Sequence, residues 1–63
     1  MIMIEKHGMH IKNYKSVESI EEDRIIIFEE YGKLIIRGSD LEVRYFSAIE
    51  IVVLGQVSRI EII

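Results

Sequence analysis

Apolar and polar residues alternate along most of this 63-residue chain, with the period of two that is typical of β-strands. Ile and Val occupy many of the apolar positions, and these β-branched side chains pack well on a pleated sheet. The pattern therefore predicts an all-β fold. The expected strands cover residues 9–13, 24–30, 33–37, 41–46, 49–54 and 57–62, with a further strand at 2–5.

Short connections between these strands favour antiparallel neighbours. We therefore expect one domain over residues 1–63, built as a small antiparallel meander whose curled sheet forms a barrel or a small sandwich. Residues 16–23 fall outside the predicted strands. They form either a connection or a short helix, in which Ser16 or Ser19 caps a turn that continues into Glu21 and Glu22.

The register of the predicted sheet depends on a hairpin at Tyr31 and Gly32. A two-residue loop at these positions requires a positive φ, which glycine adopts readily. With this loop, Phe28 lies opposite Ile35. The same register pairs Glu30 with Lys33, Ile27 with Ile36 and Ile25 with Gly38.

This register divides the apolar side chains between two faces of the sheet. The predicted core face carries Ile25, Ile27, Leu34 and Ile36, and is continued by Leu41, Val43, Tyr45, Ile49, Ile51 and Val53. The opposite face carries the candidate interface residues Ile26, Phe28, Ile35, Val52 and Leu54, which Phe46 and Ile63 are expected to extend. Two explanations fit a sheet with two apolar faces. Either the N-terminal strands fold over the second face, or another subunit or a partner protein covers it.

A weak internal repeat accompanies this pattern. A shift of 17 residues aligns Leu34 with Ile51, Ile36 with Val53 and Gly38 with Gly55. The repeat favours two similar strand pairs that follow one another along the chain.

Length and composition favour an oligomer. A domain of this size buries only about 60% of the surface that its unfolded chain exposes. The chain has no Cys, so neither a disulfide nor a thiolate metal site stabilises it, and we expect a homo-oligomer.

The longest apolar run, from Ile51 to Leu54, is far too short to span a bilayer. The first residues do not resemble a secretory signal, so we expect a cytoplasmic protein. A net charge of −3 makes nucleic acid an unfavourable partner.

Few residues suggest catalysis or metal binding. His7 and His10 are three apart, and on a strand they point to opposite faces. The acidic residues Glu18, Glu21, Glu22 and Asp23 lack the spacing of a calcium loop and fit a solvated connection. The neighbouring Glu29 and Glu30 also point apart. We therefore predict no catalytic residue, metal, cofactor or small-molecule substrate.

Four segments taken together resemble a known family. They run from Ile11 to Glu18, from Ile25 to Ile27, from Gly32 to Val43 and from Gly55 to Glu61. The most specific part is Gly-x-Leu-x-Ile-x-Gly-x-x-Leu-x-Val, followed after about a dozen residues by Gly-x-Val-x-x-Ile-Glu. In this order the segments resemble the YabP/YqfC family of sporulation proteins, most closely its YqfC branch. The chain departs from the family pattern at Tyr14 and Ser16, where His and Gly are common, and in its shorter N-terminal region.

The resemblance implies a role in endospore formation in the mother cell, as a small non-enzymatic protein beside a membrane protein of the same pathway. The forespore-facing membrane is one expected location. It implies no site residues. The residues themselves favour a structural or scaffolding module. An alternative is a small Sm-like barrel that binds RNA or another ligand, indicated by Ile36-Arg37-Gly38 alone. An Sm-like protein would also need an N-terminal helix and a basic rim.

Overall fold

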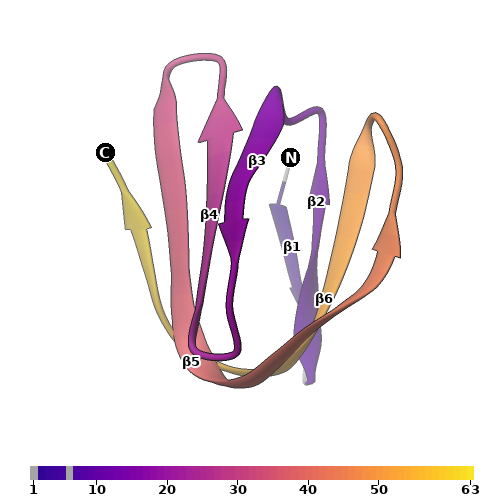
Figure 1. The fold of residues 1–63 in the computed structure, drawn as a ribbon, viewed down its shortest axis with the longest axis vertical. Helices are drawn as coiled ribbons and strands as arrows, with labels where there is room; N and C mark the ends of the chain where they lie inside the picture. The colour runs from indigo at the N-terminus through magenta and orange to yellow at the C-terminus, as the bar shows by residue number, and fades with distance from the viewer. Residues whose placement is uncertain (1, 6) are drawn as a thin grey trace.

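The computed structural model describes residues 2–5 and 7–63. They form six strands and no helix: β1 (Ile2–Glu5), β2 (Gly8–Lys12), β3 (Ser16–Ile20), β4 (Arg24–Glu29), β5 (Gly32–Phe46) and β6 (Glu50–Ile62). All neighbours are antiparallel, in the order β1-β2-β6-β5-β4-β3 (Figure 1). The all-β prediction, with its strand at residues 2–5, is confirmed.

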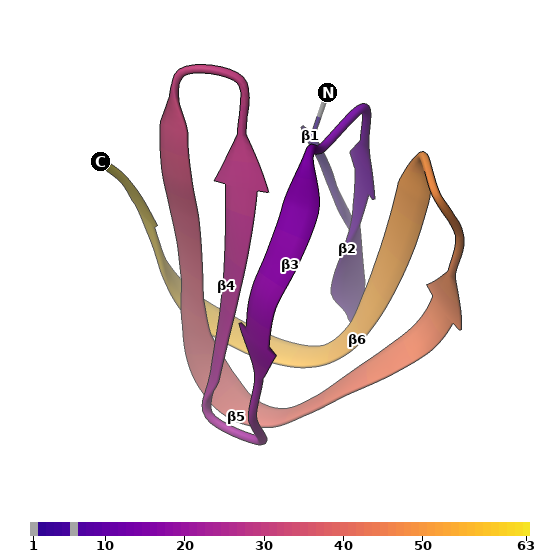
Figure 2. The same cartoon turned by 45° about the horizontal axis from the view of Figure 1, so that its top comes forward.

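Strands β5 and β6 are long and bend sharply together (Figures 1 and 2). Their pairing shifts register at three places, between Arg37 and Gly38, between Ser39 and Glu42, and between Val43 and Tyr45. The strands predicted at residues 33–37 and 41–46 are thus the two halves of β5, and those predicted at 49–54 and 57–62 are the two halves of β6. The bend divides the sheet into two arms. The first arm contains β3, β4, residues 32–39 and residues 56–62, and the second contains β1, β2, residues 42–46 and residues 50–54.

The prediction of a simple meander is wrong for the N-terminal hairpin. The strands from β3 to β6 are neighbours in chain order, but β2 pairs with β6 and not with β3. The first half of β6 therefore lies between β2 and the second half of β5. This pairing sets Met9 opposite Val53 and Ile11 opposite Ile51, all of them buried. The sheet curls, as predicted, but it does not close, so the expected barrel is wrong and β1 and β3 are free edges.

The hydrophobic core lies between the two arms. Ile25, Ile27, Leu34 and Ile36 are fully buried, as predicted. The other buried members are Met9, Ile11, Tyr14, Leu41, Ile51 and Val53, with Ile2, Val17, Val43, Val57 and Ile60 packed around them. Each arm thus covers the apolar face of the other, which is how this open sheet buries a core.

The loop between β4 and β5 lies one residue earlier than predicted, which shifts the pairing of the two strands by two positions. Glu29 pairs with Gly32 and Ile26 with Ile35, so the turn residues are Glu30 and Tyr31. Because side chains alternate with a period of two, this shift leaves every face assignment in the two strands unchanged. Gly32 has no positive φ. It is needed because a Cβ at this position would collide with the backbone carbonyl of Ile63.

Residues 16–20 form a strand, so both the connection and the short helix expected for residues 16–23 are wrong there. Val17 pairs with Ile27 and packs against the core, whereas a register shift before Ser19 leaves Glu18 in a bulge. The strand exists because the edge of β4 offers a partner. Nothing in the local pattern of polar residues indicates it.

A second register shift, between Val43 and Tyr45, reverses two side chains at the end of β5. Tyr45 pairs with Val52 on the outer face, and Phe46 pairs with Ile51 on the inner face. The predictions of Tyr45 in the core and Phe46 on the second face are therefore wrong, because the bulge breaks the alternation. Ile49, also predicted in the core, lies exposed in the connection to β6.

Residues 13–15 tie the two arms together. The amide of Asn13 donates to the carbonyl of Ile49 (2.8 Å) in the second arm, and the amide of Lys15 donates to the carbonyl of Phe28 (2.8 Å) in the first. Between them Tyr14 is only 8% exposed, packs edge-on against Phe46, and donates its hydroxyl to the carbonyl of Ser47. This link is called the strap below.

The bend itself is held by backbone contacts. Gly55 (φ 120°) lies against the carbonyl of Asp40, which also has a positive φ (54°). The turn between β3 and β4 docks on the bend, because the amides of Gly38 and Leu41 donate to the carbonyls of Asp23 (3.1 Å) and Glu22 (2.8 Å).

We expect Gly55→Ala to lower the free energy of unfolding by about 1–3 kcal/mol, because the positive φ is strained for alanine and the added Cβ meets the carbonyl of Asp40. Urea unfolding measures the change. The exposed neighbour provides the control, since Gln56→Ala should change stability by less than about 0.5 kcal/mol. Equal stability of both variants would show that β6 does not bend in this way.

Burial raises the pKa of the Tyr14 phenol above its ordinary value of 10.0. Its contribution to stability is therefore full below about pH 10, where the unfolded phenol titrates, and is lost as the pH rises through the folded pKa. We expect Tyr14→Phe to cost about 1 kcal/mol at neutral pH, through the lost hydrogen bond to Ser47, and to weaken the decline above pH 10. Urea unfolding from neutral to alkaline pH measures both effects. Tyr31→Phe, at an exposed position, should reproduce neither.

Candidate functional site

The five candidate interface residues fall into two groups on the outside of the fold. Ile26, Phe28 and Ile35 lie on the outer face of the first arm, where Ile26 pairs directly with Ile35. Val52 and Leu54 lie on the outer face of the second arm, opposite His10 and Gly8 of β2. The two groups therefore lie on different arms of the sheet, on either side of the bend of β6.

The first group is framed by ion pairs. Lys33 places its Nζ 5.2 Å from the centre of the Phe28 ring and 3.4 Å from Glu18 Oε1. Arg37 Nε donates to Glu61 Oε1 at 2.7 Å, and this hydrogen bond lowers the pKa of Glu61. Ile35, at the centre, is only 9% exposed. Its neighbours within the chain therefore already cover most of this apolar group.

The second group lies beside a mixed polar cluster. Glu50 Oε2 is 3.1 Å from His10 Nε2 and 3.6 Å from Lys12 Nζ, on the same face as Val52. His7 lies in the turn between β1 and β2, away from this cluster. In residues 2–5 and 7–63, no three His, Cys, Asp or Glu side chains converge as metal ligands would.

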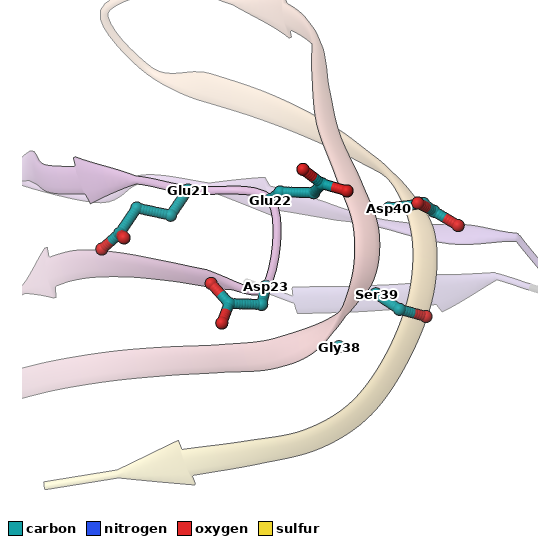
Figure 3. Close-up of a pocket in the computed structure, with 6 residues that line it drawn as sticks. All are labelled: Glu21, Glu22, Asp23, Gly38, Ser39 and Asp40. Carbon is teal, nitrogen blue, oxygen red and sulfur yellow. The ribbon is translucent and has the colours of Figure 1, made fainter.

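The acidic turn between β3 and β4 borders a surface hollow with the bend of β5. Its lining includes Glu21, Glu22, Asp23 and Asp40. Figure 3 shows that the carboxylates of Glu21 and Asp23 point away from those of Glu22 and Asp40. Glu21 forms an ion pair with Arg24 (2.8 Å) instead. This arrangement makes a charged corner of the fold, and its backbone carbonyls anchor the bend.

Large apolar side chains are exposed at the tips of both arms, at the opposite end of the fold from this corner. The turn between β4 and β5, the connection between β5 and β6, and the end of β6 all lie in the upper half of Figure 1, at the tips of the two arms. The exposed residues of these segments and of the adjoining end of β5, called the apolar end below, are Tyr31, Tyr45, Phe46, Ile49, Ile62 and Ile63. The most exposed is Tyr31, at 93%.

Reasoning from the sequence missed most of the apolar end, because strand periodicity assigns a face and does not show which strand ends project beyond the core. Ile62 illustrates the difference. It pairs with Leu34, which is fully buried. Ile62 itself remains exposed because no described element covers this end of the first arm. The one available signal was Tyr31, an aromatic residue at a predicted turn.

The remaining exposed apolar residues lie on the two edge strands. Met3 and Ile4 belong to β1, and Ile20 belongs to β3. No described residues form a helix of the length and apolar character needed to cross a membrane.

In a comparison with protein families, the model of the YabP family matches residues 1–62. The match is to the family as a whole, so the closer likeness to its YqfC branch stays a prediction. Neither the curated proteins nor the solved structures contain a match to this chain.

Proposed function

The chain belongs to the YabP family of sporulation proteins, and we propose that it acts in the mother cell as a non-enzymatic scaffolding module that docks on a partner protein through its apolar end. The partner in this proposal is a membrane protein of the sporulation pathway. Catalysis, nucleic acid and a small-molecule substrate have no part in it.

The observation that carries the proposal is the uneven distribution of surface residues. Six of the nine exposed large apolar side chains among the described residues belong to the apolar end. The carboxylates of Glu21, Glu22, Asp23 and Asp40 occupy the other end (Figures 1 and 3). Grouped apolar side chains favour association, because contact with a partner removes them from water.

The aromatic members strengthen this interpretation. Tyr31, Tyr45 and Phe46 provide large contact area at a low cost in side-chain entropy, and tyrosine is enriched among residues that dominate binding energy. Phe46 is also positioned by its edge-on contact with the buried Tyr14, so the strap holds one tip of the apolar end in place (6.1 Å between ring centres).

The outer group of Ile26, Phe28 and Ile35 has a smaller role in this proposal. Its side chains are half-buried or buried within the chain, and Lys33 and Arg37 at its rim already have partners in Glu18 and Glu61. A partner would gain less by covering it. We assign it, with Val52 and Leu54, to the margin of the contact.

The double variant Tyr31→Asp and Ile49→Asp tests the proposal. Both positions are exposed, so the fold should be retained, while two charges at the contact should cost about 2 kcal/mol or more of binding free energy. In sporulating cells that lack the natural gene, we expect the double variant to give far fewer heat-resistant spores than the wild-type protein.

The matched control is Ile20→Asp, which places a charge at an exposed position on β3, at the acidic end. It should support sporulation as the wild type does, at the same protein level and with the same circular dichroism spectrum. Full activity of the Tyr31→Asp, Ile49→Asp protein would refute docking through the apolar end, and normal sporulation without any copy of the gene would refute the role itself.

A further inference from the structure

The two edges of the sheet differ in how they are protected against pairing with another strand. Edge strand β3 contains a bulge between Val17 and Ser19, and Glu18 in that bulge pairs with Lys33 (3.4 Å). Bulges and charged side chains are common protections of edge strands. Edge strand β1 has no bulge, and its one charged residue, Glu5, stands at its end. Its pairing with β2 is regular from Ile2 to Glu5, and its first three residues are apolar.

The side chain of Ile4 shows that β1 has a described strand on one side alone, that of β2. It pairs with Met9, which is buried, so it lies on the core face of the sheet. It is nevertheless 66% exposed, because no described strand lies on the free side of β1. A further strand there would cover Ile4 and would also bond the outward N–H and C=O groups of the edge.

We infer that β1 of a second copy of this chain pairs antiparallel with β1 and joins the two sheets about a two-fold axis at Met3. In this arrangement the three apolar residues of one copy lie opposite the same three residues of the other. Ile2 lies opposite Ile4 of the second copy on the core face, and the two Met3 side chains meet on the outer face. Such a contact closes on itself, so it gives a dimer and no fibre.

Glu5 selects this register. The two sheets keep their core faces on the same side only if one β1 slides along the other in steps of two residues. Each such step moves the two-fold axis by one residue. An axis at Ile4 would set Met3 opposite Glu5, and an axis at Glu5 would set two carboxylates opposite each other. Only the axis at Met3 pairs apolar residues throughout Ile2, Met3 and Ile4.

The dimer is independent of the proposed docking at the apolar end. β1 contributes none of the residues that define the apolar end, so the two contacts use different residues. The two inferences can therefore fail separately.

Sedimentation velocity over a range of concentrations tests the dimer. The wild-type chain should form dimers, and Met3→Lys should raise the dissociation constant several-fold or more, because two like charges meet at the axis. Ile20→Lys is the matched control at a similarly exposed position on the protected edge, and should leave the constant unchanged. The Tyr31→Asp, Ile49→Asp protein should dimerise like the wild type.

A wild-type chain that stays monomeric at the highest soluble concentration would overturn the inference. So would a dimer that Ile20→Lys or the Tyr31→Asp, Ile49→Asp change disrupts and Met3→Lys does not.

Crosslinking tests the register. The natural chain has no Cys, so Met3→Cys introduces a single thiol, and antiparallel partners at the axis have the separation that a disulfide needs. Under mild oxidation Met3→Cys should give covalent dimers much faster than Ile20→Cys. Equal rates for the two variants would refute pairing at Met3 even if the protein is dimeric.

Discussion

The paired bend of β5 and β6 is the constraint on which the rest of the structure depends. These two strands run through both arms, and every other strand attaches to them directly or through one neighbour. Because they bend together, their backbone pairing continues around the corner with three register shifts and no break in the sheet. The bend turns one sheet into two arms that face each other, so a chain too short for two separate sheets still buries a core.

The corner determines where charge and apolar surface lie. At the bend the acidic turn between β3 and β4 supplies carbonyls to the amides of Gly38 and Leu41, and its carboxylates remain in water. At the other end the arms diverge, and the strap links them through the backbone of residues 13–15 and the buried side chain of Tyr14. Residues at the tip of each arm have no residues of the other arm to cover them, so their side chains stay exposed. The apolar end is therefore a direct consequence of a short, open, folded sheet.

The two free edge strands exist because the sheet does not close. A closed barrel would have no free strand, but this sheet ends at β1 and β3. Edge β3 carries a bulge and a paired carboxylate, whereas β1 has no bulge and begins with three apolar residues. Protection of one edge and not the other is the asymmetry expected where one edge stays free and the other is used.

The sequence by itself determined the fold class and the core face of the central strands. Alternation identified Ile25, Ile27, Leu34 and Ile36 as buried even though the loop was placed one residue too late, because the resulting shift of two in the strand pairing preserves the faces. It also aligned Gly38 with Gly55, and these glycines lie where β5 and β6 bend. Only the tertiary structure decided that four apparent strands are two, that residues 16–20 form an edge strand, and that Tyr45 and Phe46 exchange faces. The reason is physical: periodicity reports which side of a local strand is apolar, whereas bulges, bends and partners are set by contacts between residues far apart in the chain.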